Sequence, residues 1–151
     1  MNKERLSYSK IAPESLKGLL EMEKYVAGSG LDMTIFELVK TRASQINGCA
    51  YCIDMHTKDA RSQGETEQRL YGLSAWRETP FYSEKERAAL EWTEALTLIS
   101  ENEVSDSLYE KVNKHFDDKM MIALTMAIVA INGWNRLAIS FRNEVGNYKP
   151  K

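Results

Sequence analysis

The sequence predicts an all-α protein, a single-domain helical bundle of about six to seven helices. Apolar residues recur at helical spacing through most of the 151-residue chain, and no segment alternates as a strand between hairpin turns. The three prolines, Pro13, Pro80 and Pro150, stand where a helix should begin or a loop should run. A chain of this length suits one compact core, so we expect residues 1–151 to form one domain.

Two helices are expected before residue 48. The first follows Pro13 and ends at the Gly-Ser-Gly segment 28–30. Asp32 can cap the second helix, which ends at Gly48, a residue suited to the left-handed conformation after a helix. Their apolar stripes consist, in turn, of Leu16, Leu19, Leu20 and Val26, and of Ile35, Leu38, Val39, Ala43 and Ile46.

Two further helices and a loop are expected in the middle of the chain. A helix runs from about 49 to 63 and is closed by Gly64, and a short helix follows near 65–74. The segment 76–82, which contains Pro80, is expected to be a loop.

Three helices complete the expected fold. Ser83 and Glu86 form a capping-box pattern at the start of one helix, a second begins after Ser105, and the last runs from about 117 to 143. The side chains that the first of these should turn inward are Ala88, Trp92, Ala95, Leu96 and Ile99.

The last helix is apolar nearly all round between residues 120 and 131. Such a helix must be covered on every side, either as the central helix of a monomer or at a subunit interface, and we expect a homo-oligomer. Polar residues beside it need partners, and we expect them to serve the structure. These residues are Asn132, Asn135 and Arg136, together with Trp134.

The composition is that of a soluble globular protein, with 43% hydrophobic residues, 28% charged residues and a net charge of −2. No block of Lys and Arg indicates binding to nucleic acid or to an anionic membrane. The N-terminus MNKERLSYSK lacks the apolar stretch of a signal peptide, and the apolar run 120–131 is too short to span a bilayer. We therefore expect a cytoplasmic protein with no nucleic-acid or membrane partner.

A Cys-x-x-Cys pair, Cys49 and Cys52, begins the third expected helix. At about 100° per residue the two thiols share a stripe with His56, so all three side chains should point inward. The free N–H groups of a first helical turn lower the pKa of a thiol, whereas apolar surroundings raise it. His56, one turn after Cys52, could accept or relay a proton.

In a reducing cytoplasm, two cysteines at this spacing are more typical of catalysis or metal binding than of a structural disulfide. A zinc site remains an alternative, with Cys49, Cys52 and His56 as ligands and a fourth ligand from His115 or a carboxylate. Inert packing of the three side chains is the other alternative. A thioredoxin fold would need a βαβ pattern near the motif, and the sequence has none.

The segment ELVKTRASQINGCAYCIDMH, from Glu37 to His56, resembles the core of the alkylhydroperoxidase D-like family within the carboxymuconolactone decarboxylase superfamily. Its distinctive feature is a glutamate twelve positions before a Cys-x-x-Cys-x-x-x-His motif. The resemblance extends from about Ile35 to Arg142 and implies the helical bundle of that family. Outside the core segment it is carried by residues 57–61, 65–70, 73–77 and 131–136.

The resemblance implies a thiol-dependent peroxidase of the alkyl hydroperoxide reductase type, active in antioxidant defence. Cys52 would attack a small hydroperoxide and become a sulfenic acid, and Cys49 would resolve it to an intramolecular disulfide. Glu37 and His56 would form a proton relay. An external dithiol or a protein reductant would reopen the disulfide, and neither a bound cofactor nor a metal is needed. Members of the family commonly assemble as trimers or hexamers.

Two positions fit this resemblance less simply. The helical pattern places Glu37 opposite the apolar stripe and by itself favours a solvent-exposed face, unless another element or subunit covers that face. Tyr51 stands where the best-known peroxidases of the family carry a histidine. It projects away from the cysteine stripe, so we expect a packing residue.

Two other functions remain open at this stage. One is a carboxymuconolactone decarboxylase-like lyase, which needs a carboxylate-binding pocket and a proton donor but no dithiol, so the cysteine pair argues against it. The other is a non-enzymatic redox sensor or helical partner-binding protein, which would form the disulfide without turnover.

Overall fold

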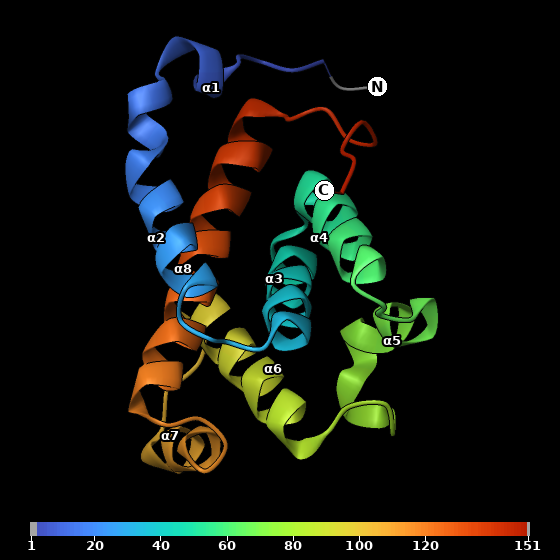
Figure 1. Ribbon diagram of the computed structural model, residues 1–151, viewed down its shortest axis with the longest axis vertical. Helices are drawn as coiled ribbons and strands as arrows, with labels where there is room; N and C mark the ends of the chain where they lie inside the picture. Colours follow the sequence, from blue (N-terminus) through green and yellow to red (C-terminus); the bar gives the residue numbers. More distant parts are fainter. Residues whose placement is uncertain (1–2, 151) are drawn as a thin grey trace.

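The computed structural model describes residues 3–150, which form helices and no strand. This part of the chain has eight α-helices, slightly more than the six to seven expected, and two 3₁₀ helices (Figure 1). In chain order the elements are α1 (Tyr8–Ile11), η1 (Pro13–Leu16), α2 (Lys17–Ala27), α3 (Met33–Asn47), α4 (Ala50–Ser62), α5 (Glu67–Gly72), η2 (Leu73–Glu78), α6 (Glu84–Thr97), α7 (Asp106–Asn113) and α8 (Asp118–Phe141).

The capping residues read from the sequence act as predicted. The Asp32 side chain accepts hydrogen bonds from two backbone N–H groups at the start of α3. Ser83 and Glu86 form the complete capping box of α6. Gly48 ends α3 with φ of 70°, in the left-handed region that a residue without Cβ adopts without strain. These local hydrogen bonds explain why most helix boundaries follow from sequence.

Two expectations for the middle of the chain are wrong. Part of the expected loop 76–82 belongs to the 3₁₀ helix η2, because Trp76 is buried and its indole N–H donates to Glu94 Oε1 at 2.9 Å. Helix α6 ends at Thr97, so Ile99 lies beyond it and is 62% exposed rather than inward. Both differences depend on contacts between distant parts of the chain and on where a helix ends. The spacing of apolar residues along one helix predicts neither.

Helix α3 lies between other helices of the same chain, packing against α4, α6 and α8 (Figure 1). Buried side chains therefore occur on both its apolar and its polar faces. Glu37 is 4% exposed, so the solvent-exposed position favoured by the helical pattern is wrong. The second face is covered from within the chain, and this fold turns the carboxylate of Glu37 toward the interior.

Helix α8 runs through the molecule and packs against α2, α3 and α6. Its 24 residues make it long and apolar enough to cross a membrane by length and composition, which corrects the estimate from the shorter run 120–131. Its packing among three helices is that of a core helix. One face nevertheless remains open in the single chain, with Ile122 56% and Val129 48% exposed.

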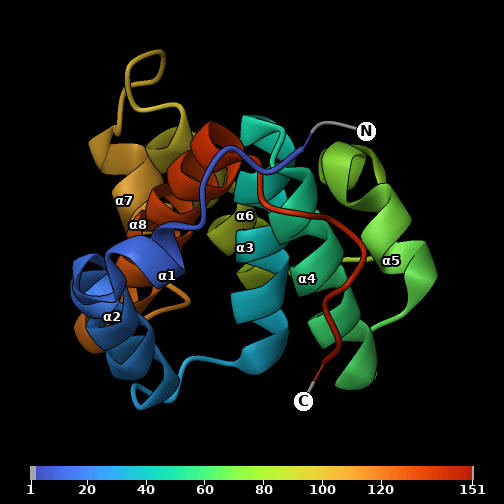
Figure 2. The ribbon, with the colours of Figure 1, turned by 90° about the horizontal axis from the view of Figure 1, so that it is seen from above.

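The segment after α8 lies across α4, as the views from two sides show (Figures 1 and 2). The Lys58 ammonium donates to the backbone carbonyls of Gly146 and Tyr148 at 3.2 and 3.1 Å. The Tyr148 hydroxyl donates to the carboxylate of Asp59. These bonds hold the C-terminal segment beside the helix that carries the cysteine pair.

Candidate functional site

The corner between α3 and α4 positions the cysteine pair. Cys49 is the N-cap of α4, and its Sγ accepts the backbone N–H of Cys52 at 3.4 Å. Its own N–H donates to the carbonyl of Ser44, which fixes the corner after Gly48. Both cysteines are free thiols and both are 1% exposed, so the inward direction predicted from the helical stripe is confirmed.

The two thiols have opposite pKa shifts. The pKa of Cys49 falls from 9.0 to about 7, chiefly because the Cys52 thiol donates to its sulfur, with help from backbone N–H groups and Asn135 and against the effect of burial. The pKa of Cys52 is raised by its pairing with Cys49 and by burial, although Asn135 and Lys40 oppose the rise. Both shifts therefore arise chiefly from the contact between the two thiols.

Helices α3 and α4 bring Glu37 and His56 into direct contact. His56 Nδ1 lies 2.8 Å from Glu37 Oε2, and both side chains are 5% exposed. A carboxylate at Nδ1 favours the tautomer that carries the proton on this nitrogen. The Nε2 atom of His56 is buried and has no hydrogen-bond partner in the described chain. This nitrogen is therefore available as a proton acceptor.

A cavity of about 500 Å³, the Cys52 cavity, joins these groups. Its charged and reactive lining residues include Cys52, His56 and Glu37, so three of the four predicted site residues share it. The aromatic side chains that line it are Tyr8, Phe36, Tyr51, Trp134 and Tyr148. Tyr51 is a packing residue as predicted, but it packs against the cluster that contains both cysteines and lines this cavity, which its direction away from the cysteine stripe of an isolated helix does not reveal.

A buried charge pair beside the cysteines escaped the sequence analysis. Lys40 is 2% exposed, and its ammonium lies 2.5 Å from the carboxylate of Glu23 on α2. The indole of Trp134 donates to the same carboxylate at 2.9 Å. Burial lowers the pKa of Lys40, and Glu23 opposes this shift. No motif marks the pair, because its members are seventeen residues apart on different helices.

Asn135 is the second residue whose role the sequence understated. It is 1% exposed and lies on α8, where its side-chain amide donates to Ser44 Oγ and accepts from Asn47. It serves the structure as expected, since it joins α8 to the end of α3. It also lowers the pKa of both cysteine thiols, so it belongs to the surroundings of the pair.

The zinc alternative requires Cys49, Cys52 and His56 to lie together with a fourth ligand, and residues 3–150 do not bring these side chains together. The group of possible metal ligands in this part of the chain is Glu37, His56 and Asp59, whose ligand atoms lie within 4.8 Å of one another, and neither cysteine belongs to it. His115, offered as a fourth ligand, is exposed beyond α7.

Known proteins similar to this chain share both sequence and fold. Residues 13–95 match the model of the carboxymuconolactone decarboxylase family. The uncharacterized protein YdfG of Bacillus subtilis is 50% identical over 144 residues, which cover 95% of this chain and 98% of YdfG. A solved structure from Agrobacterium tumefaciens, of unknown function and proposed to be an antioxidant defence protein AhpD, is 44% identical with a TM-score of 0.92, covering 97% of this chain and 100% of that one.

A more distant structure shows the same fold. A peroxidase-related protein from Ralstonia eutropha JMP134 with an alkylhydroperoxidase AhpD core has a TM-score of 0.80 at 17% identity, covering 92% of this chain and 74% of that one. The family match spans more than half of the chain, and half of the residues are identical in a relative of almost the same length. This chain is therefore a member of the carboxymuconolactone decarboxylase family, of the alkylhydroperoxidase D-like type.

Proposed function

We propose that this protein is a thiol-dependent peroxidase that reduces a small hydroperoxide through a Cys49–Cys52 dithiol/disulfide cycle. The observation that carries the proposal is the shared Cys52 cavity, in which a thiol, a buried imidazole and its carboxylate partner meet. The unpartnered Nε2 of His56 is the acceptor that a thiol must have before it can act as a nucleophile. A lyase would not use the pair of cysteines.

The oxidising half of the cycle uses Cys52, His56 and Glu37. Cys52 transfers its proton to His56 Nε2, and Glu37 stabilises the resulting imidazolium at Nδ1. The thiolate attacks one oxygen of the hydroperoxide, the O–O bond breaks, and the alkoxide takes the proton from His56 and leaves as an alcohol. Cys52 is then a sulfenic acid.

The resolving step uses Cys49. Backbone N–H groups and Asn135, which lower the pKa of this thiol, remain in place after Cys52 is oxidised. Its thiolate attacks the sulfur of the Cys52 sulfenic acid, and the hydroxyl leaves as water with a proton, so the disulfide forms within the chain. An external dithiol or protein reductant then reduces it. We place this cycle in the cytoplasm, with no bound cofactor and with neither nucleic acid nor membrane as partner.

The proposal is tested by counting thiols and measuring turnover. Addition of one equivalent of cumene hydroperoxide to the reduced protein should remove both thiols of a chain, and dithiothreitol should restore them. Steady-state consumption of the hydroperoxide with dithiothreitol should follow. Formation of the disulfide without turnover would indicate a redox sensor instead, and thiols unchanged by the hydroperoxide would contradict the proposal.

We also propose that the chain forms a homo-oligomer, a trimer or a hexamer, through the open face of α8. Ile122 and Val129 lie two helical turns apart on this face, and both are about half exposed in the single chain. Exposed apolar residues repeated along one helix face are typical of a surface that another protein covers.

The variant Val129→Asp should therefore dissociate the oligomer into monomers, measured by light scattering, because burying an unpaired carboxylate at an interface is costly. The matched control is Ile99→Asp, at an exposed apolar residue outside the helices, which should leave the mass unchanged. A wild-type protein that is monomeric at micromolar concentration would refute the proposed assembly.

A further inference from the structure

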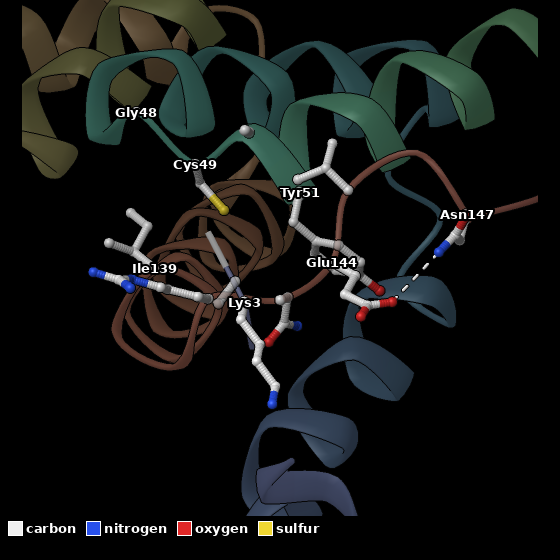
Figure 3. Close-up of a pocket in the computed structure, with 12 residues that line it drawn as sticks. Lys3, Gly48, Cys49, Tyr51, Ile139, Glu144 and Asn147 are labelled. Atoms are coloured by element: carbon white, nitrogen blue, oxygen red, sulfur yellow. Dashed lines mark hydrogen bonds between the residues drawn. The ribbon is translucent and has the colours of Figure 1, made fainter. Parts of the chain in front are cut away.

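The two sulfurs of the pair open on different cavities. Cys52 lines the Cys52 cavity, whereas Cys49 lines a second cavity of about 740 Å³, the Cys49 cavity. The two cavities share only Tyr51 and Ala138 among their lining residues, so these two side chains form the wall between them. Figure 3 shows the sulfur of Cys49 pointing into the second cavity, between Ile139 and Tyr51.

The geometry of thiol–disulfide exchange determines which sulfur can be attacked from each cavity. An attacking thiolate approaches a disulfide sulfur in line with the S–S bond, on the side away from the leaving sulfur, so access decides which sulfur is attacked. Each cysteine is 1% exposed, and its sulfur is reached through the cavity that it lines. A reductant in the Cys49 cavity therefore attacks Cys49, and one in the Cys52 cavity attacks Cys52.

The charges lining the two cavities differ. The Cys49 cavity has two cations, Lys3 and Arg142, against the single carboxylate of Glu144. The Cys52 cavity has one cation, Lys40, against three carboxylates. These carboxylates belong to Glu23, Glu37 and Asp59. An attacking thiolate is an anion, so the charges of the Cys49 cavity attract it and those of the Cys52 cavity repel it. A neutral hydroperoxide is affected little by the charges of either cavity.

We propose that the Cys49 cavity is the binding site of the thiol reductant, separate from the Cys52 cavity that takes the hydroperoxide. This assignment rests on the proposed peroxidase function. The thiolate of a dithiol reductant attacks Cys49 Sγ, the S–S bond breaks, and its electron pair passes to Cys52, which takes up a proton. The second thiol of the reductant then attacks its own sulfur in the mixed disulfide, which releases the Cys49 thiolate and the oxidised, cyclic reductant.

The surroundings of Cys52 suit it as the leaving group in this step. The largest cause of its raised pKa in the reduced protein is the hydrogen bond with Cys49. That cause disappears when Cys49 is bonded to the reductant. Burial still raises the pKa of Cys52, but Asn135 and Lys40, which both lower it, remain in place and stabilise the departing thiolate.

The test fills one cavity at a time and measures each half-reaction separately. Ile139→Trp enlarges a half-exposed residue that lines the Cys49 cavity and not the Cys52 cavity, and Met55→Trp enlarges a partly buried residue that lines the Cys52 cavity and not the Cys49 cavity. Ile99→Trp is the control, at an exposed site that lines neither of these cavities. Rapid quenching with iodoacetamide and mass spectrometry follow the oxidation of the reduced protein by cumene hydroperoxide and the reduction of the oxidised protein by dithiothreitol.

Ile139→Trp should slow reduction by about tenfold or more and leave oxidation at the wild-type rate, because access to the attacked sulfur limits exchange. Met55→Trp should slow oxidation and spare reduction. Arg142→Glu, which changes charge without filling space, should slow reduction severalfold. If Ile139→Trp slows oxidation instead, or if both tryptophan variants slow both half-reactions alike, the assignment of the cavities is wrong.

The outcome can be separated from that of the proposed function. Diamide forms the disulfide without any hydroperoxide, so reduction of the diamide-oxidised variants by dithiothreitol tests the Cys49 cavity alone. If the wild-type protein does not react with hydroperoxide but Ile139→Trp slows its reduction by dithiothreitol, the thiol site is supported and the peroxidase assignment is wrong. Equal reduction rates in wild type, Ile139→Trp and Arg142→Glu would overturn the thiol site.

Discussion

Replacing Cys52 by serine is expected to reduce hydroperoxide turnover to the uncatalysed background. The serine hydroxyl stays protonated near neutral pH and cannot form the sulfenic acid on which the cycle depends. The side chains are close in size and the position is buried among small and apolar neighbours, so the fold should persist. The measurement is steady-state consumption of cumene hydroperoxide with dithiothreitol, with circular dichroism to confirm the helices.

Cys49→Ser is the matched variant, because it removes the other thiol of the same helix. It should form the sulfenic acid on Cys52, detectable by dimedone labelling, but should not complete the cycle. It should also lose the ionisation near pH 7, followed by ultraviolet absorbance, because the lowered pKa of Cys49 depends chiefly on its hydrogen bond with Cys52. Dimedone labelling on Cys49 in the Cys52→Ser variant, with turnover retained, would reverse the roles of the two cysteines.

Replacing His56 by glutamine should lower turnover by about 10²- to 10⁴-fold, the range typical of losing a general base. Glutamine has no basic nitrogen to take the proton from Cys52. Glu37→Gln should act through His56 with a smaller loss, because the neutral amide can still accept the Nδ1 proton but does not stabilise the imidazolium. The measurement is the rate at which cumene hydroperoxide oxidises the reduced protein, which should fall in both variants and furthest in His56→Gln.

The second histidine of the chain supplies the control for this prediction. His115 is exposed beyond α7 and lines neither the Cys52 cavity nor the Cys49 cavity. His115→Gln should therefore leave the oxidation rate unchanged. Wild-type oxidation kinetics in His56→Gln would show that another group activates Cys52.

The position of the cysteine pair is the part of the site that local sequence predicts well. Gly48 ends α3, the helical spacing of buried residues resumes directly after it, and Cys49 takes the N-cap position within one residue of the expected start. The spacing of Cys52 and His56 then places both on the buried face of α4, since side chains four residues apart share a helix face. The lower pKa of Cys49 was left open by the sequence, because the helix terminus and burial act in opposite directions.

Glu37 shows where the helical pattern fails. A stripe of apolar residues identifies one buried face of a helix, but it cannot tell whether a second face is also covered. The resemblance to a known family placed Glu37 in the site, and the contacts of α3 with three neighbouring helices supply the physical reason. The Lys40–Glu23 pair was missed, and the place of Asn135 beside the thiols was not foreseen, for the same reason, since each depends on helices far apart in the chain.

Most helix boundaries, the direction of the two thiols and the imidazole, and the family follow from the order of the residues, because caps, turns and helix faces depend on neighbours within a few positions. The burial of Glu37, its contact with His56 and the separate cavities on the two sulfurs depend on how α3, α4, α8 and the C-terminal segment pack together. A one-dimensional pattern does not specify which helices meet, and so it cannot show which sulfur faces which cavity.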